Sequence, residues 1–402
     1  MSNRRRPLYT PRRGLTLPVT RRNVLRGVSA GALTVAGGGV LSACGVEGAS
    51  QTSESCQSED LSEEEKEVIW SNWPAYIDPI QQSDSTLKAF EEATGITVEY
   101  ADDVNDNNDF YAKVRNQLGA CESPGRDMFT LTDWMAAKMI DLGWLQKLDK
   151  ANLPNFEANL IESLRAPSWD ENRDYSVPWQ SGVTGIAYNA DETGEVGSFE
   201  DLLTNSDLKG RVTLLTEMHD TMLFMLLVTG ADPEDFTADE WQVALDRLEE
   251  VKDSGQIRQF TGNDYRQDLA QGNIAACEAW SGDVIQLQFD NPAIKFVAPE
   301  EGLAIWSDNS LVPNKATHKT NAEMLMDYYY DPKAAAELAA WVNYICPVEG
   351  AKEEMEKIDP SLVDNVLIFP DEELLSDTKN FMGLDSDTED EYQQDFVRVI
   401  GG

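Results

Sequence analysis

Short apolar runs alternate with segments of helical periodicity over residues 67 to 144. Apolar residues three or four positions apart, such as Tyr111, Val114 and Leu118, predict helices, and the compact apolar runs between them predict strands. The predicted strands are 67–73, 96–104 and 127–132, and the predicted helices are 83–95, 108–120 and 133–144. Strands separated by helices favour a parallel sheet with right-handed crossovers.

A segment punctuated by proline and glycine, "YSVPWQSGVTGIAYN" (175–189), interrupts this pattern and is expected to cross between two lobes. A second α/β unit follows it. Its predicted strands are 210–216, 273–280, 294–299 and 302–313, and the later predicted helices are 221–230, 237–255, 320–330, 331–345 and 391–400. We therefore expect an α/β protein built of two lobes.

Four tryptophans stand at the ends of predicted strands, each beside polar residues. They are Trp73 in "NWPAY", Trp134 in "TDW", Trp280 in "EAWSGD" and Trp306 in "IWSDN". Ligands of open parallel sheets bind outside the carboxyl ends of the strands. One such tryptophan would more often be structural, but four of them in both lobes favour a binding site. Aromatic faces hold organic cations, and a carboxylate supplies the counter-charge.

The first 43 residues have the pattern of an export signal. Arg21 and Arg22 precede a weakly apolar run at 28–41, which is too short to predict a membrane span. The order resembles a twin-arginine signal, used for proteins exported already folded, and "LSAC" resembles a lipoprotein cleavage box in which Cys44 carries the lipid. The alternative is an internal helix with a chance arginine pair. The predicted location is the outer face of the cytoplasmic membrane.

Residues 44–66 are polar, acidic and without periodicity, which predicts a disordered tether. Besides Cys44 the chain has Cys56, Cys121, Cys277 and Cys346, which allow three pairings, and the sequence does not choose among them. No CxxC occurs, so zinc is not indicated.

Charge excludes one class of partner. The chain has 72 acidic and 32 basic residues, a net charge of −40, and eight of the arginines lie within residues 1–43, where there is no acid. The remainder therefore carries −40 − 8 = −48. Such a surface repels nucleic acid, and it suggests solubility in very high salt, as in a halophilic archaeon-like source.

Catalytic motifs are missing from the sequence. No GxSxG, P-loop, HExxH or GxGxxG follows a predicted strand, so no catalytic residue, cofactor or metal is predicted. His219 and His318 have no identifiable catalytic partners, and His318 is expected to be a solvated loop residue. A carboxylate pair of the glycosidase kind cannot be singled out among so many acids.

Eight segments in a fixed order resemble the periplasmic spermidine/putrescine-binding proteins of ABC importers. They are "NWPAYIDP", "FEEATGITVEY", "FYAKV", "KMIDLGWLQKLD", "DYSVPW", "GIAYN", "EAWSGD" and "IWSDNSLVP". The resemblance implies a two-lobed, class II periplasmic-binding fold whose lobes close on ligand. It implies lobes at 67–182 with 306–345 and at 183–305 with 346–402. It also implies a monomer that docks on ABC permease subunits and is not an enzyme.

The family's ligand-binding residues fall on seven positions. The resemblance implies that the ligand contacts Trp73, Tyr76, Thr132, Trp134, Trp280, Trp306 and Asp308. In the family, the acid that falls on Asp308 grips an amino group of the ligand.

Other positions depart from the family. Its Thr-Glu after the first tryptophan is Pro74-Ala75 here, and a late tyrosine falls on Cys346. The family's second-lobe acids fall in "EMHDTM" (217–222). Without a gap they fall on Met218 and Thr221, and with a one-residue gap they fall on His219 and Met222. Glu217 or Asp220 replaces them only if the local alignment differs. A small cation or amine is therefore expected, with spermidine or putrescine as one form of it.

Three alternatives stay open. The first keeps the fold and the transport role but binds another amine, an amino-acid derivative or a metal complex. The second is a secreted hydrolase, which requires a nucleophile motif or paired carboxylates in the cleft. The third is a surface adhesion protein, which predicts a shallow cleft and no response to amines.

Overall fold

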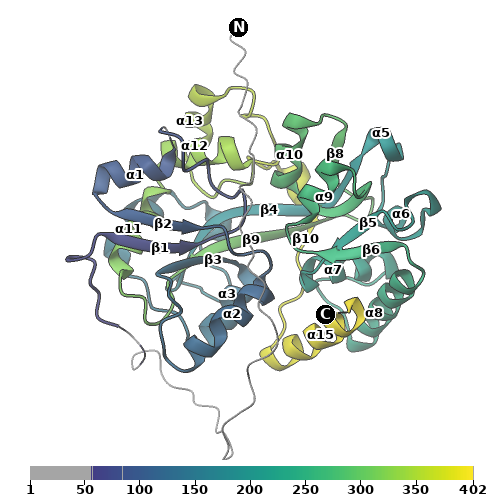
Figure 1. The fold of residues 1–402 in the computed structure, drawn as a ribbon, viewed down its shortest axis with the longest axis horizontal. Helices are drawn as coiled ribbons and strands as arrows, with labels where there is room; N and C mark the ends of the chain where they lie inside the picture. Colours follow the sequence, from purple (N-terminus) through teal and green to yellow (C-terminus); the bar gives the residue numbers. More distant parts are fainter. Residues whose placement is uncertain (1–55, 57, 84, 402) are drawn as a thin grey trace, which may run out of the picture. The chain divides into compact units, whose positions relative to one another are not determined.

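The computed structural model describes residues 56, 58–83 and 85–401 (Figure 1). One mixed sheet with helices on both sides organises this part of the chain. In the described part no helix combines the length and the apolarity that crossing a membrane requires.

Strands from both halves of the sequence share the sheet, in the order β2-β1-β3-β9-β4-β7-β5-β6, with β10 paired to β9 and β8 paired to β4. The bounds are β1 (Glu67–Ser71), β2 (Thr97–Ala101), β3 (Met128–Thr132), β4 (Ser176–Asn189), β5 (Val212–Leu215), β6 (Ile257–Thr261), β7 (Ala276–Trp280), β8 (Ile294–Val297), β9 (Leu303–Leu311) and β10 (Thr378–Lys379). Strands β1, β2 and β3 are parallel, as predicted, and so are β5, β6 and β7.

Helices fill the connections between these strands, as the alternating pattern predicts. Their bounds are α1 (Thr86–Thr94), α2 (Asn107–Gly119), α3 (Asp133–Asp141), α4 (Pro154–Asn159), α5 (Ala190–Thr193), α6 (Phe199–Thr204), α7 (Met218–Thr229), α8 (Ala238–Asp253), α9 (Tyr265–Gln271), α10 (Ser281–Asp290), α11 (Lys319–Tyr328), α12 (Pro332–Val342), α13 (Ala351–Ile358), α14 (Glu372–Ser376) and α15 (Ser386–Ile400).

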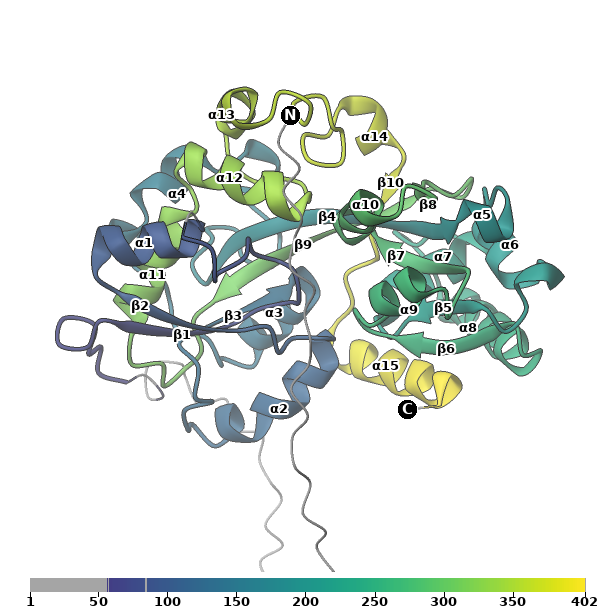
Figure 2. The ribbon, with the colours of Figure 1, turned by 45° about the horizontal axis from the view of Figure 1, so that its top comes forward.

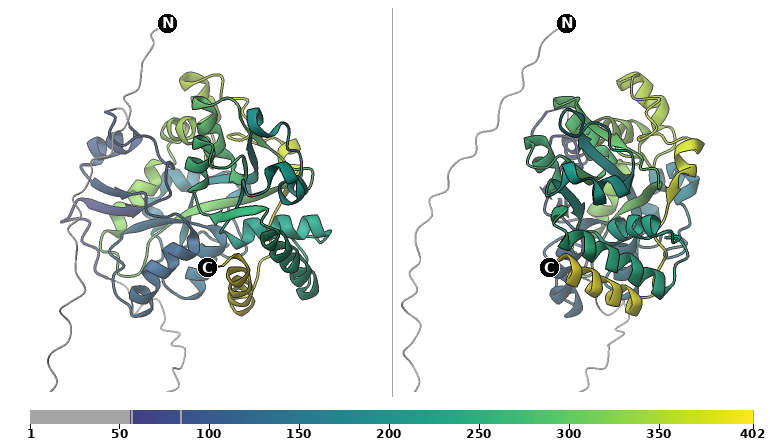
Figure 3. Two further views of the ribbon diagram at one scale, coloured as in Figure 1. Left: turned by 45° about the vertical axis from the view of Figure 1, so that its right-hand side comes forward. Right: turned by 90° about the vertical axis from the view of Figure 1, so that its right-hand side faces the viewer.

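Two large hydrophobic cores organise the packing, and the first extends past the crossing strands to residues such as Leu215 and Tyr265. The first core packs α1, α2 and α3 against β1 to β3 through residues such as Trp70, Phe90 and Phe129. The second core packs α7, α8 and α15 against β5 and its neighbours through residues such as Phe224 and Trp241. Helix α15 runs along α8 in both views of Figure 3. Both cores bury their apolar residues almost completely, which is the main favourable term in folding.

Strands β4 and β9 join the two halves. They are antiparallel partners, and Gln180 faces Asp308 while Gly182 faces Trp306. Towards one end β9 pairs with β3, and towards the other β4 pairs with β7. The predicted crossover at 175–189 is therefore a strand, and residues near the middle of β9 lie between the two cores.

The C-terminal region divides differently from the expected lobe boundary at residue 346. Helix α13 packs beside α12, and Val348, Met355 and Ile368 belong to the first core (Figure 2). The chain reaches the second core only with the segment that contains α15. The reason is the apolar face of α13, which α12 covers.

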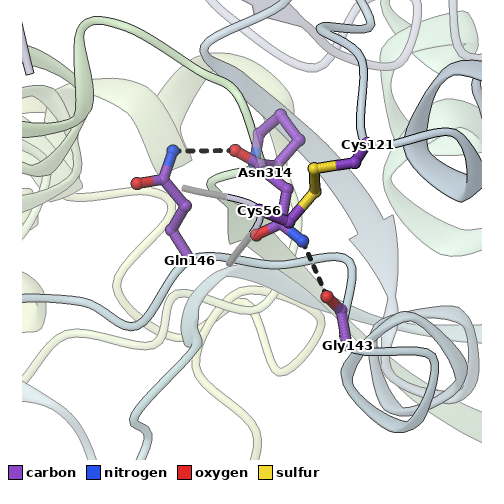
Figure 4. The surroundings of a disulfide bond; sticks show 6 residues. Cys56, Cys121, Gly143, Gln146 and Asn314 are labelled. Atoms are coloured by element: carbon purple, nitrogen blue, oxygen red, sulfur yellow. Dashed lines mark hydrogen bonds between the residues drawn. A yellow bond between two sulfur atoms is a disulfide. The ribbon is translucent and has the colours of Figure 1, made fainter. Parts of the chain in front are cut away.

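The segment expected to be a tether is partly fixed to the body. Leu61 donates its backbone N–H to the Thr317 carbonyl over 2.7 Å, and Cys56 forms a disulfide with Cys121 (Figure 4). Near this disulfide, Asn314 donates to the Gly143 carbonyl over 2.7 Å. Cys277 and Cys346 are free and buried. The expected disorder is therefore wrong for residues 58–66, because side-chain and backbone hydrogen bonds hold them, and Cys44 lies outside the described residues.

Candidate ligand-binding cavity

Twelve side chains from both halves of the molecule line one narrow cavity. Its space free of atoms is about 390 Å³, including the open mouth. The lining residues are Trp73, Pro74, Tyr76, Thr132, Glu217, Asp220, Asn263, Trp280, Asp283, Trp306, Asp308 and Tyr344. Most of them follow the carboxyl ends of β1, β3, β5, β6 and β7, which is where ligands of such sheets bind.

Aromatic rings form a continuous wall of this cavity. Trp73 meets Trp280 edge-on, with ring centroids 5.6 Å apart, and Trp280 meets Trp306 at 6.3 Å. Tyr344 continues the wall, with its ring 5.6 Å from that of Trp306 and 4.9 Å from that of Tyr76. These edge-to-face and tilted contacts leave ring faces available to a cation.

Two glycines make room for this wall. A Cβ atom on Gly182 would lie 2.5 Å from Cζ2 of Trp306, and one on Gly282 would lie 2.5 Å from Cδ2 of Tyr344. No real Cβ atom approaches its neighbours so closely, so any side chain at these two positions would push a ring of the wall aside.

A hydrogen-bonded chain connects two acids across the cavity. Thr132 donates its hydroxyl to Oδ1 of Asp308 over 2.7 Å, and the Asn107 amide donates to the Thr132 hydroxyl over 2.8 Å. The Asn107 backbone N–H and amide also donate to Oε1 of Glu217, over 2.8 and 3.0 Å. Asp308 and Glu217 are thereby held in place from both halves of the molecule.

Helix α7 begins at Met218, three residues before the predicted start, and this places Glu217 and Asp220 at its amino end. Negative charge is favoured there by the helix dipole. Asp220 accepts a hydrogen bond from Thr184, whose hydroxyl also accepts from Nε1 of Trp306 over 2.9 Å. The acid and the ring are therefore oriented together.

Burial makes these carboxylates hard to ionise. It raises the pKa of Asp308 to about 7 and that of Asp220 to about 6, and it raises the pKa of Glu217 well above the usual value. Behind them, burial raises the pKa of Glu278 to about 8. Within the described chain, no lysine or arginine forms an ion pair with Glu217, Asp220 or Asp308.

Asp283 differs from the other acids of the cavity because it has a cationic partner. Arg266 lies 3.5 Å from its Oδ1, and Asn263 and Tyr265 donate to its Oδ2 over 2.7 and 2.8 Å. The cavity as a whole therefore holds three acids without a counter-charge, the buried Glu217 and Asp308 and the partly buried Asp220, beside one acid that has its own.

Two buried polar atoms in the lining, Nε1 of Trp73 and Oε2 of Glu217, make no hydrogen bond to the rest of the described chain. The Tyr76 hydroxyl is directed at Asp308, and this contact lowers the pKa of that carboxyl against the effect of burial. Buried polar groups are normally paired, so an unpaired donor and an unpaired acceptor in one cavity favour a polar ligand.

The sequence from residue 85 to 366 matches the family model described as bacterial extracellular solute-binding protein. This match covers well over half of the chain. The chain belongs to this family. Membership agrees with the expected class II periplasmic-binding fold, with a place outside the cytoplasmic membrane, and with a binding protein rather than an enzyme.

Relatives agree with this assignment, and a solved structure agrees with the fold. The chain is 25% identical over 327 residues to the spermidine/putrescine-binding periplasmic protein of Escherichia coli, covering 80% of this chain and 89% of that one. It is 28% identical over 303 residues to the putrescine-binding periplasmic protein PotF of the same organism, covering 71% and 78%. The structure of the substrate-binding protein PotD of Streptococcus pneumoniae superimposes with a TM-score of 0.65 at 23% identity, covering 83% and 98%.

Six of the seven residues expected to bind ligand line the cavity, and Trp134 does not. Trp134 borders a larger neighbouring hollow and stacks on His219, with ring centroids 4.7 Å apart. His219 in turn stacks on Phe381 at 4.5 Å and contacts Glu389 through Nε2 at 3.0 Å. The reason is the position of Trp134 in the first turn of α3, which directs its ring away from the aromatic wall.

Six lining residues are not among the expected ones: Pro74, Glu217, Asp220, Asn263, Asp283 and Tyr344. The resemblance offers Glu217 and Asp220 as replacements for the family's acids only in a different alignment. Met222, one of the positions on which those acids would otherwise fall, lies in the second core. The family's late tyrosine falls on Cys346, which does not line the cavity, whereas Tyr344, two residues earlier, does. Asp283 is the last residue of the motif "EAWSGD" and lies in the first turn of α10, which begins at Ser281. A predicted helix start at this position is the signal that identifies Asp283 as a lining residue.

His318 is not the solvated loop residue that the sequence predicts. Its side chain is 5% exposed, and Nδ1 and Nε2 lie 2.9 Å from carboxylate oxygens of Asp127 and Glu65. The cause is long-range: Asp127 precedes β3 and Glu65 precedes β1, and both strands lie beside the segment that carries His318.

Proposed function

We propose that this chain is the solute-binding component of an ABC importer and that it captures a small organic cation of the polyamine class. The observation that carries the proposal is the set of three carboxylates without a counter-charge, two of them buried and Asp220 partly buried, enclosed by aromatic rings. A bound ammonium group would provide the missing charge and would lie against the ring faces. The names of the relatives, which are spermidine- and putrescine-binding proteins, support the same class of ligand.

In this proposal Asp308 grips one amino group and Asp220 and Glu217 receive the positive charge at the other side of the cavity. Trp73, Tyr76, Trp280 and Trp306 enclose the carbon chain between them. Thr132 acts by orienting Asp308 through its hydroxyl. Pro74 and Ala75 offer no carboxylate, so a third ammonium group would lack a partner, which favours a short diamine over a longer triamine.

Lobe closure is the second part of the proposal. Contacts between the two halves support it: Thr216 donates to Asp106 over 2.6 Å, Asn107 donates to Glu217, and Trp73 meets Trp280. Ligand captured between the halves would strengthen these contacts and stabilise the closed form, which then docks on the permease.

Export and anchoring complete the proposal. Arg21, Arg22 and Cys44 support a twin-arginine lipoprotein signal, and all three lie outside the described residues. The mature chain would be a monomer on the outer face of the cytoplasmic membrane, and its net acidity supports work in high salt.

The test is thermal unfolding in molar salt with putrescine, spermidine and a matched uncharged control, butane-1,4-diol. A ligand that binds only the folded form at 100 times its Kd raises the melting temperature by about 3–5 °C for a body of this size. Putrescine is expected to do so and butane-1,4-diol is not. A shift only with another amine would keep the fold and role but change the ligand, and no shift with any cation would contradict the proposal.

A further inference from the structure

His318 and two glutamates converge on one point at the edge of the first core, remote from the ligand cavity. The ligand atoms of Glu65, Glu67 and His318 all lie within 4.8 Å of one another. Nε2 of His318 lies 2.9 Å from Oε2 of Glu65 and 3.8 Å from Oε1 of Glu67. One imidazole nitrogen and two carboxylates form a donor set that zinc-like divalent ions accept.

The imidazole is fixed by a third carboxylate behind it. Asp127 faces Nδ1 of His318 at 2.9 Å, and it also accepts backbone hydrogen bonds from Ile69, Thr317 and His318. These bonds leave Asp127 little freedom, so the ring presents Nε2 to the two glutamates. A carboxylate on the far ring nitrogen is the usual arrangement around a metal-binding histidine.

The two glutamates are held to the same element by their backbones. The buried amide of Asn321, near the start of α11, donates to the Glu65 carbonyl over 2.8 Å and to the Glu67 carbonyl over 3.1 Å. Their side chains are 51% and 58% exposed, which leaves room for water to complete a coordination sphere. Two ligands on one tetrahedral zinc ion lie about 3.4 Å apart, and the observed separations of 2.9 and 3.8 Å bracket that value.

We propose that Glu65, Glu67 and His318 form a binding site for a divalent transition metal of the zinc type. The ion would displace the proton that otherwise lets Nε2 donate to Glu65. It would bind Nε2 and one oxygen of each glutamate, with water in the fourth position. Because Glu67 begins β1 and Glu65 lies near the end of the segment expected to be a tether (44–66), the ion would fasten that segment to the body.

The site is independent of amine binding, so it can be tested without an amine. Metal-stripped protein is titrated with ZnCl₂ by calorimetry in molar KCl with excess Mg²⁺, which occupies non-specific acids. The expected result is one Zn²⁺ per chain with micromolar Kd, and proton release, seen as a dependence of the heat on the buffer. The Glu65→Gln/Glu67→Gln double variant should bind at least tenfold more weakly, while Glu64→Gln, an exposed neighbour, should bind as the wild type does.

His318→Gln should lose binding as well, but the buried ring also supports Asp127, so circular dichroism must first show that this variant folds. The glutamate variants change only exposed side chains and keep the test decisive. Absence of saturable Zn²⁺ binding to the wild type would overturn the proposal. Equal binding by the double variant would overturn it too, because the ion would then lie elsewhere.

Discussion

Thr132 and Asp308 lie directly opposite each other on the antiparallel strands β3 and β9, and the threonine hydroxyl donates to Oδ1 of the aspartate over 2.7 Å. β3 belongs to the first half of the molecule, and β9 crosses to the second half. The pair therefore holds the main acid of the cavity at the junction between the halves, where a captured cation would lie.

The affinity for a cation should increase as pH rises from about 5 to about 8. In the ligand-free protein, burial raises the pKa of Asp220 to about 6 and of Asp308 to about 7. Both are then largely protonated at pH 5, and a bound cation must displace those protons. Calorimetry with putrescine across this range should show stronger binding and less proton release as pH increases. Affinity independent of pH would exclude these acids as ligand contacts.

The stability of the ligand-free protein should change in the opposite sense. An acid whose folded pKa exceeds its unfolded pKa binds more protons when folded, so the free energy of unfolding falls as pH rises between the two values. For Asp308 these values are about 7 and 3.8, and for Glu278 about 8 and 4.5. Thermal unfolding without ligand should therefore show these groups costing stability from about pH 4 to pH 8, and saturating putrescine should reduce that loss.

Gly282→Ala and Gly182→Ala should weaken cation binding at least tenfold, because the new methyl groups displace Tyr344 and Trp306. Overpacking of this kind costs about 1–3 kcal/mol of stability. Gly197→Ala is the matched control, since its Cβ would meet nothing within 4 Å. Titration of all three variants with putrescine separates the effect on the wall from a general effect of alanine, and equal affinities would show that the two rings do not shape the site.

Trp134 should act on closure rather than on ligand choice. Its ring stacks on His219, between α3 and α7, and it lies outside the cavity. Trp134→Leu is expected to lower the affinities for all cations by one common factor of about 2–5. Trp280→Leu should lower them more than tenfold through lost ring contact, worth about 2 kcal/mol for a desolvated cation. If Trp134→Leu changed the ratio of putrescine to spermidine affinity, Trp134 would have to contact the ligand.

Reduction of the disulfide between Cys56 and Cys121 should destabilise the body. The two cysteines are 65 residues apart, and closing such a loop stabilises by about 4 kcal/mol on the chain-entropy account. Thermal unfolding with and without dithiothreitol measures the loss. Cys56→Ser is the genetic equivalent, and Cys277 should not react with a thiol reagent until the protein unfolds, since it is buried. An unchanged melting temperature after verified reduction would contradict this expectation.

Local pattern accounts for much of the fold. The alternation of apolar runs and helical periodicity predicts β1 to β3 with α1 to α3, because each element carries its own signal. The crossing strands β4 and β9 were expected as extended segments, but their pairing depends on contacts between residues more than 100 positions apart. Helices α9 and α10 were not predicted, since their short, mixed sequences have weak periodicity.

The resemblance predicts those site residues that lie in or at the end of a predicted strand. It does not predict those whose identity depends on the exact alignment of a helix start with the family. Trp73 and Trp280 stand at the ends of strand signals, and Asp308 lies within the strand signal that forms β9. Glu217 and Asp220 depend on α7 beginning at Met218, and Tyr344 depends on the close approach that Gly282 allows. His318 shows the same limit, because its partners Asp127 and Glu65 are brought to it only by the tertiary fold.

The most direct measurement is calorimetric titration of the wild type and Asp308→Asn with putrescine in molar salt at pH 8. The account predicts saturable binding of one putrescine per wild-type chain. It predicts a loss of at least 100-fold in Asp308→Asn, about 2.7 kcal/mol, since removal of one partner of a buried charge pair typically costs this much or more. Asp253→Asn, whose side chain is 68% exposed on α8, should bind like the wild type. Unchanged affinity in Asp308→Asn, or no binding of any amine by the wild type, would contradict the account.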